Sequence, residues 1–246
     1  MEAVERRADG RAPGDLRSCS LLPRYLELHP ASCLIKTGRT WVLCTASVEE
    51  RVPPFLEGTG RGWVTGQYAM MPGCVPDRIA PSQNQGGRAE EISRLLGRSL
   101  RAAVDLAGLG PRMITVDCQV VQADGGTRTA SVTGGYVALA LALGQLQEQG
   151  VLNQADSPAA SVLRREVAAV SVGLVAGAAL LDLDYREDAG ADADLNVVMT
   201  SDGGLVEVQG TAEREPYSRD QLQVLLDLAA DGIRSLFEAQ RAALTA

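Results

Sequence analysis

Residues 122–135 read Gln-Ala-Asp-Gly-Gly-Thr-Arg-Thr-Ala-Ser-Val-Thr-Gly-Gly, and the segments on either side are best understood as supports for this stretch. Residues 113–121 alternate in polarity and are rich in β-branched side chains, which predicts a strand. Residues 136–146 are rich in Ala and Leu and contain no breaker, so a helix is expected there, with Thr129 or Ser131 as its cap. The chain therefore passes from a strand through a glycine pair into a helix.

This order of elements is typical of an anion-binding site. Backbone N–H groups in the first helical turn lack partners, and the helix dipole favours negative charge at that end. Gly125 and Gly126 allow an oxyanion to approach the main chain, and the planar guanidinium of Arg128 is suited to two phosphate oxygens. A tight turn between a strand and a helix explains the glycine pair equally well, so the stretch alone leaves both interpretations open.

Composition narrows the possible functions. The chain has 246 residues, 46% hydrophobic, which allows one large soluble domain with a sizeable core. A formal net charge of -8 argues against non-specific coating of nucleic acid, because that binding depends on neutralising phosphates. With a single histidine, His29, Ser-His-Asp catalysis has almost no material to work with.

The cysteines and the N-terminus bear on location. Five cysteines without a Cys-x-x-Cys pair suggest neither a disulfide framework nor a zinc site. The N-terminal residues 1–7 lack the apolar region of a secretory signal, and no run is expected to reach the roughly 20 apolar residues that span a bilayer. We therefore expect a cytoplasmic protein without a membrane segment.

The first half is predicted to contain a hairpin and a long loop before its helix. Residues 1–17 are charged and are expected to run over the surface. Strands are predicted at 32–36 and 39–48, joined at Thr37-Gly38. Residues 52–66 are predicted as loop with at most short strand pieces, and 70–87 as a long, mobile loop.

A helix is predicted from Arg88, because apolar residues recur at steps of three and four from Ile92 to Ala107. A cation is not favoured at a helix start, so Arg88 is either a solvated side chain, which is the commoner case, or a ligand of an anion.

The second half repeats this plan. Residues 167–175 and 179–185 form a predicted hairpin around Gly177. Strands at 195–200 and 205–209 precede an amphipathic helix over 218–243. The sequence is therefore mixed α+β and possibly duplicated, although the halves share no obvious residues.

An acidic loop follows the second hairpin. Six carboxylates fall within thirteen residues: Asp182, Asp184, Glu187, Asp188, Asp192 and Asp194. Solvated surface charge explains them as readily as a metal site. Because Mg²⁺ keeps most of its waters and needs only one or two carboxylates beside substrate phosphate oxygens, Asp188 and Asp194, at the entry to the next strand, would suffice.

Seven ordered stretches resemble the ribonuclease PH family of phosphorolytic 3′-to-5′ exoribonucleases and tRNA nucleotidyltransferases. They are RADGR at 7–11, VLCTASVEE at 42–50, GWVT at 62–65, GRSLRA at 97–102, QADGGTRTAS at 122–131, DLNVVMT at 194–200 and EVQGTAE at 207–213. They extend over nearly the whole chain.

The resemblance implies an α+β ribonuclease PH fold, of the ribosomal protein S5 domain 2-like type, with two βαβ-type halves. Residues 1–246 would form a single domain with halves at about 15–150 and 160–246. It also implies trimming of the 3′ ends of tRNA precursors with release of nucleoside diphosphates, reversible nucleotide addition, and a homohexamer.

The resemblance further implies the residues of the site. Arg88, Gly126, Thr127 and Arg128 would bind inorganic phosphate, the co-substrate. Asp188 and Asp194 would bind Mg²⁺ or Mn²⁺ and would act in catalysis together with the two arginines. These are the residues that the sequence pattern singles out on its own.

Departures from the family are concentrated in one loop. Members usually carry several arginines there, whereas Arg78 is the only arginine between Pro72 and Arg88, and residues 73–87 form a shorter loop. Such arginines support the hexamer in the family. The alternative hypotheses are a catalytically weak paralogue that serves as an RNA-binding or ring-forming subunit, and a small-molecule phosphotransferase.

Overall fold

Strand β5 (Met113–Gln122) leads through the glycine turn into helix α2 (Thr127–Glu148), which confirms the predicted strand, turn and helix. The computed structural model describes residues 7–152 and 162–246. Helix α2 begins earlier than predicted, with Gly126 as an N-cap that has no side chain to offer. Thr129 and Ser131 therefore lie inside the helix, where their hydroxyls donate to the carbonyls of Gly126 and Thr127.

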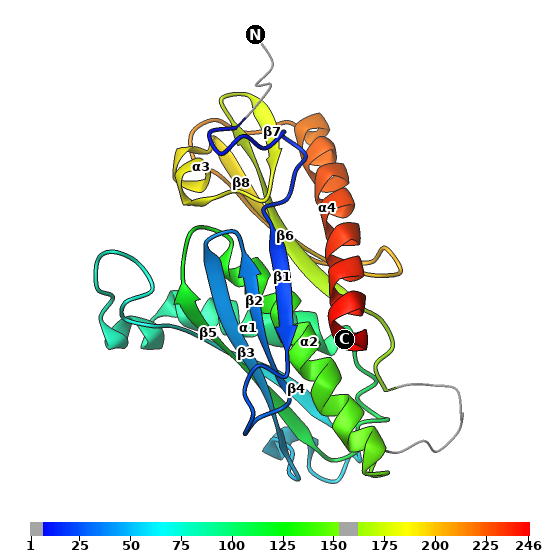
Figure 1. Ribbon diagram of the computed structural model, residues 1–246. Coiled ribbons are helices and arrows are strands. Elements are labelled where there is room, and N and C mark those ends of the chain that lie inside the picture. The colour runs from blue at the N-terminus through cyan, green and yellow to red at the C-terminus, as the bar shows by residue number, and fades with distance from the viewer. Residues whose placement is uncertain (1–6, 153–161) are drawn as a thin grey trace.

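The first half is built on a five-stranded sheet (Figure 1). Its strands are β1 (Cys19–Pro23), β2 (Ser32–Thr37), β3 (Thr40–Glu49), β4 (Trp63–Met70) and β5, in the order β1-β2-β3-β5-β4. Only β4 and β5 are parallel, and helix α1 (Gly87–Arg101) connects them in a βαβ unit. Short 3-10 helices, η1 (Pro54–Leu56) and η2 (Pro81–Gln85), lie in the loops on either side of β4.

The second half is built on a four-stranded antiparallel sheet. Its strands are β6 (Val167–Val175), β7 (Ala178–Leu181), β8 (Ala193–Thr200) and β9 (Leu205–Ala212), in the order β7-β6-β8-β9. The short helix α3 (Tyr185–Gly190) lies between β7 and β8, and α4 (Arg219–Thr245) ends the chain. The α+β fold is therefore confirmed, with the parallel βαβ unit in the first half.

Strand β6 separates two hydrophobic layers. Val167 and Ala169 join the core formed by α1, α2 and the first sheet, whereas Ala168, Val170 and Val172 pack with α4. This alternation follows from the period of two in a strand. Helix α2 is apolar nearly all round because it packs against both sheets, and α4 runs along the other face of the second sheet (Figure 1).

Helix α2 also corrects one expectation from the sequence. By length and composition its 22 residues could cross a bilayer, although no such run was expected. However, 83% of its most apolar window is buried inside the protein, so its hydropathy reflects its place in the core.

Four other expectations were wrong. The strand predicted at 179–185 ends at Leu181, and Tyr185 begins α3 inside the predicted acidic loop. Strands β1 and most of β4 were missed, and the N-terminal segment does not simply run over the surface, because Arg7 and Arg17 are buried. Helix α1 ends at Arg101 and not near Ala107. The apolar spacing continues, but the chain leaves the helix to pair with residues 162–164 through the Val104–Leu163 bridge. Residues 1–6 and the junction of the predicted halves, 153–161, lie outside the described part of the chain.

The packing of α2 on the first sheet predicts opposite effects for two glycines of that helix. A Cβ at Gly134 would lie 2.6 Å from Ile35 Cγ2 and 3.1 Å from Cys44 Sγ, so Gly134→Ala should lower the free energy of unfolding by about 1–3 kcal/mol through overpacking. A Cβ at Gly144 meets nothing within 4 Å, so Gly144→Ala should raise it by about 0.5–1 kcal/mol. Denaturant unfolding of both variants tests this, and equal effects would contradict it.

Candidate active site

A polar cleft of about 1040 Å³ lies where the two halves meet, and the glycine turn forms one wall. It is lined by all six residues selected from the sequence: Arg88, Gly126, Thr127, Arg128, Asp188 and Asp194. The first four come from α1 and the start of α2, and the two acids come from α3 and β8. The fold thus brings the predicted anion-binding and acidic residues into one cleft.

The glycine turn has a backbone that only glycine adopts easily. Gly125 and Gly126 have φ of +76° and +65°, and a Cβ at Gly125 would lie 2.7–2.8 Å from backbone atoms of residues 183–185. The buried hydroxyl of Thr40 donates to Gly125 O at 2.6 Å and accepts from Asp124 N–H at 2.9 Å. The turn is therefore fixed to the start of β3 on one side and packed on the loop before α3 on the other.

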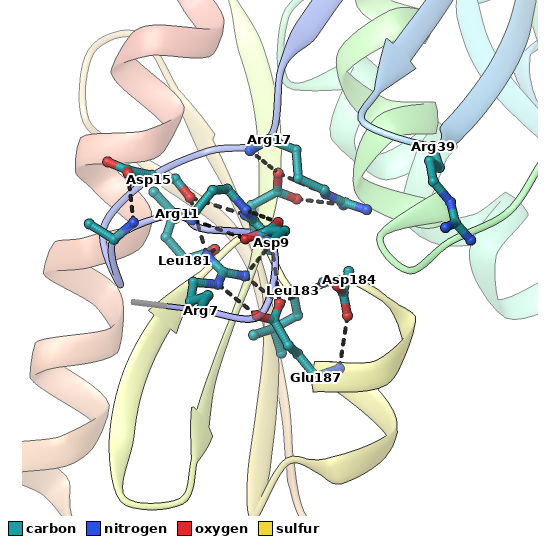
Figure 2. Close-up of polar contacts among 12 residues, drawn as sticks. Arg7, Asp9, Arg11, Asp15, Arg17, Arg39, Leu181, Leu183, Asp184 and Glu187 are labelled. Atoms are coloured by element: carbon teal, nitrogen blue, oxygen red, sulfur yellow. Dashed lines mark hydrogen bonds and ion pairs between the residues drawn. The ribbon is translucent and has the colours of Figure 1, made fainter. Parts of the chain in front are cut away.

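A buried ion pair joins the glycine turn to the second half (Figure 2). Arg17 Nε and Nη2 donate to the Asp182 carboxylate at 3.0 and 2.6 Å, and Arg17 Nη1 donates to Asp124 O at 2.6 Å. Burial alone would lower the pKa of Arg17, but the hydrogen bonds and charge of Asp182 raise it above its usual value. One guanidinium thus holds the turn and the end of β7 in a fixed relation.

The two predicted arginines differ in their surroundings. Arg88 is exposed at the second residue of α1, and its side chain has no hydrogen-bond or ion-pair partner among residues 7–152 and 162–246. Arg128 is largely buried, and its Nη1 donates to Gln209 Oε1 at 2.6 Å and to Glu91 Oε1 at 3.4 Å. Its Nε and Nη2 have no partner within the same described ranges, so they remain available to an anion.

The six acids of the 182–194 segment divide into two groups. Four have structural partners: Asp182 pairs with Arg17, Asp184 caps α3, Glu187 pairs with Arg7, and Asp192 pairs with Arg214. Asp188 and Asp194 form no ion pair with any described residue, and both face the cleft. The interpretation of the whole segment as solvated surface charge is therefore wrong, because four of its six acids are bound by structural partners.

The electrostatics of the two remaining carboxylates are unusual. Loss of solvation in the cleft raises the pKa of Asp188, while the charges of Arg128 and Arg88 oppose that shift. Loss of solvation also raises the pKa of Asp194, and the neighbouring charges of Asp188 and Glu213 raise it further. Two like charges in a partly desolvated cleft are stabilised by a cation between them.

This pair fits a magnesium ion better than a transition metal. The described residues contain no group of three or more His, Cys, Asp or Glu side chains able to hold a metal. Mg²⁺, however, is usually bound by one or two carboxylates and keeps several waters or takes phosphate oxygens as further ligands. Asp188 and Asp194 supply that set beside the candidate phosphate site.

Other residues of the site were missed from the sequence. The hydroxyls of Tyr68 and Thr127 lie 2.8 Å apart, and Gln209 bridges Arg128 and Glu91. Thr40 and Arg17 support the turn from far along the chain. Of the N-terminal contacts, only those of the stretch 7–11 had any signal in the sequence, because this stretch is one of the seven that resemble the family.

The fold and the cleft together define an α+β protein in which a glycine turn and two arginines share one cleft with a carboxylate pair. Solved structures share the fold. The Archaeoglobus fulgidus exosome with RNA bound to the active site has a TM-score of 0.76 and 22% identity, covering 95% of this chain and 92% of that chain. Rice (Oryza sativa) Rrp46 has a TM-score of 0.76 and 19% identity, covering 97% and 100%.

Sequence relatives are closer. Ribonuclease PH from Neisseria meningitidis serogroup B is 51% identical over 239 residues, 96% of each chain, and that from Neisseria gonorrhoeae is 50% identical over 238 residues, again 96% of each. The family model for domain 1 of the 3′ exoribonucleases matches residues 15–143, and that for domain 2 matches 166–232. The chain therefore belongs to the 3′ exoribonuclease family of the ribonuclease PH type, which confirms the resemblance read from the sequence.

The buried pair predicts a large cost for removing one partner. Arg17→Met should lower the free energy of unfolding by about 3–5 kcal/mol, because it leaves Asp182 charged and buried. Adding Asp182→Asn should recover part of this loss, since Asn tolerates the left-handed backbone of residue 182 (φ +53°) without the charge. Arg234→Met, which removes an exposed pair with Asp231, is the control and should cost less than about 1 kcal/mol by the same denaturant assay. An equal decrease in the free energy of unfolding in Arg17→Met and Arg234→Met would show that the buried pair contributes no more to stability than the exposed pair.

Proposed function

We propose that this protein is a phosphate-dependent 3′-to-5′ exoribonuclease that trims the 3′ ends of tRNA precursors, releases nucleoside diphosphates and also adds nucleotides in the reverse direction. Membership of the family supports this proposal. The observation that carries it for this chain is the meeting of Arg88, Arg128 and the α2 N-terminus with the unpaired Asp188 and Asp194 in one cleft.

Inorganic phosphate is the nucleophile in this proposal, so the protein needs no nucleophilic side chain. Arg88, the free Nε and Nη2 of Arg128, and the first backbone N–H groups of α2 at Thr127 would orient the ion. A phosphate oxygen forms a bond to the phosphorus of the last phosphodiester, and the bond from that phosphorus to the 3′-oxygen of the preceding nucleotide breaks. That 3′-oxygen takes up a proton, and the released product is a nucleoside 5′-diphosphate.

The remaining residues control charge. The arginines neutralise negative charge on the entering ion and on the phosphodiester as they are brought together. Asp188 and Asp194 would hold a divalent cation, Mg²⁺ or Mn²⁺, which when bound supplies further stabilisation of charge on the phosphoryl oxygens. A Cβ at Gly125 would meet the backbone of residues 183–185 and one at Gly126 would meet Arg17 Nη2 at 2.8 Å, so glycine at both positions keeps the turn beside the candidate phosphate site in place.

The alternative hypothesis of a catalytically weak, RNA-binding or ring-forming subunit is not favoured. Such a subunit has no need of arginines and unpaired carboxylates gathered in one cleft, and the curated relatives at 50–51% identity carry the name Ribonuclease PH. We also propose a cytoplasmic location, which suits a protein whose five cysteines are all free thiols.

The activity predicts a dependence on phosphate and on both parts of the cleft. RNA with a 3′ extension should be shortened only when inorganic phosphate and Mg²⁺ are present, with nucleoside diphosphates as products. Arg88→Ala or Arg128→Ala should each cost on the order of 2–4 kcal/mol of transition-state stabilisation, by analogy with the loss of one oxyanion donor. Asp194→Ala should abolish the release.

Arg94→Ala is the matched control, because Arg94 lies on the same helix as Arg88 and, within the described part of the chain, its ion-pair partner is the exposed Glu90. It should retain the rate of the unmodified protein. Release of nucleoside monophosphates, or shortening without phosphate, would overturn the proposal.

We propose that the chain forms a homohexamer despite its single loop arginine. The 71–86 loop projects from the body of the protein (Figure 1), and its ends are anchored by Asn84, whose side chain bonds Met70 N–H and Met70 O at 2.9 and 3.0 Å. Light scattering after size exclusion should give six times the chain mass, and Arg78→Ala should shift the protein toward dimers. A stable dimer of the unmodified chain would contradict the hexamer without affecting the proposed chemistry.

A further inference from the structure

Helix α3, which carries Asp188, cannot be held in place by a hydrophobic face. It spans only Tyr185–Gly190, contains no buried residue, and Tyr185 is 64% exposed. A single helical turn of this kind is marginal in water without tertiary contacts. The buried Leu183 and Ala191 hold the chain on either side of α3, so the orientation of the helix between them, and with it the Asp188 carboxylate, depends on polar contacts.

Two such contacts lie within the helix itself. Asp184 and Glu187 form a capping box, in which Asp184 Oδ1 accepts from Glu187 N–H at 2.9 Å and Glu187 Oε2 accepts from Asp184 N–H at 2.9 Å. This box shapes the first turn but does not attach it to the rest of the protein.

Arg7 supplies most of that attachment (Figure 2), beside a longer contact from Arg11 Nη2 to Glu187 Oε2 at 3.5 Å. Its Nε donates to Glu187 Oε1 at 2.7 Å and its Nη2 donates to Glu187 Oε2, so both carboxylate oxygens are bound by one planar fork. The Arg7 side chain is 1% exposed and that of Glu187 is 12% exposed, so solvent does little to weaken the pair.

The same guanidinium is anchored to the second sheet. Arg7 Nη1 donates to Leu181 O at 2.5 Å, and Nη2 donates to Asp182 O at 3.0 Å. Leu181 ends β7, and Asp182 is the partner of Arg17. Arg7 thus connects Glu187 to the rigid end of a strand and to the ion pair that supports the glycine turn.

We propose that Arg7 is a positioning residue: through Glu187 it fixes α3 so that Asp188, the next residue, faces Asp194 across the cleft at the spacing that a divalent cation requires. This inference rests on the proposed function of the two carboxylates. Arg7 does not line the cleft, so it would touch neither the cation nor phosphate and acts through the segments that it holds. Partners that orient metal ligands in this way are typically worth 10-fold to 100-fold in metal affinity.

The experiment measures metal affinity and the order of α3 in the full-length protein without RNA. Binding of Mn²⁺ is followed by water-proton relaxation in the presence of inorganic phosphate, and amide hydrogen exchange is measured for a peptide covering residues 183–192. The variants are Arg7→Met, which removes the fork, and Arg7→Lys, which keeps the charge but presents only one donor group. Arg241→Met is the matched control. Arg241 also donates from Nε and Nη2 to a glutamate, Glu166, but Arg241 lies on α4, far from the cleft.

The expected result is a loss of Mn²⁺ affinity of roughly 10-fold to 100-fold in Arg7→Met, a smaller loss in Arg7→Lys, and none in Arg241→Met. Exchange should accelerate in 183–192 while α2 stays protected. The concentration of Mg²⁺ for half-maximal RNA shortening should rise, with little change in KM for phosphate. Glu187→Gln combined with Arg7→Met should lose little more than either change alone, because both act through the same contact.

Each other outcome overturns the inference in a distinct way. Unchanged exchange in Arg7→Met would mean that Arg7 does not hold α3, and faster exchange with unchanged Mn²⁺ affinity would mean that α3 order does not set the site. If the unmodified protein does not bind Mn²⁺, the metal site is removed from the proposed function and this inference fails with it. The RNA-shortening assay tests phosphate-dependent activity separately, so that result would not decide the proposed chemistry.

Discussion

The arrangement of the cleft depends on the buried Arg17–Asp182 pair. Its partners are separated by 165 residues and belong to different halves of the chain, and the same guanidinium holds Asp124 O at the edge of the glycine turn. Desolvating two charges is costly and is repaid only by good geometry, which the bidentate contact and the backbone N–H of Arg17 on Asp182 Oδ2 provide. Such a pair adds little net stability compared with apolar packing, but it specifies one relative position of the two halves. The phosphate-side residues and the carboxylates meet because that relation is fixed.

The N-terminal segment extends this network. Arg7 and Arg11 both donate to Asp182 O, and Arg7 continues to Glu187, so three arginines from one short stretch surround the loop between β7 and α3. The sequence 7–17 has little hydrophobic content with which to fold by itself, and it is ordered by acids that the second half supplies. In turn, two acids of the loop, Asp182 and Glu187, are paired with these arginines, while Asp184 caps α3 and Asp192 pairs with Arg214. What remains, Asp188 and Asp194, is the part of the loop that faces the cleft.

Local patterns in the sequence predicted the elements next to the site, because β5, the glycine turn and α2 are specified by nearest neighbours. Strand β1 was missed because five residues ending in a proline give too short a pattern. Strand β4 was missed because its glycine reads as loop, although Gly66 is there to let Leu96 of α1 approach, with a Cβ only 2.6 Å from Leu96 Cγ. The six site residues were found from motif chemistry and family resemblance. Arg7, Arg17 and Thr40 were not, because nothing in the sequence near an arginine or threonine states which distant backbone it will support.

Helix α2 and helix α3 place the two parts of the cleft on scaffolds of very different local stability. The start of α2 belongs to the core of the whole protein, whereas α3 has no buried residue and opens without exposing apolar surface. Global unfolding measurements therefore report on the stability of the α2 side of the cleft and detect little of the local opening of α3. Apart from Glu187, whose loss would leave the buried Arg7 unpaired, substitutions in 184–190 should barely change the melting temperature, so loss of function in this segment has to be sought among well-folded proteins.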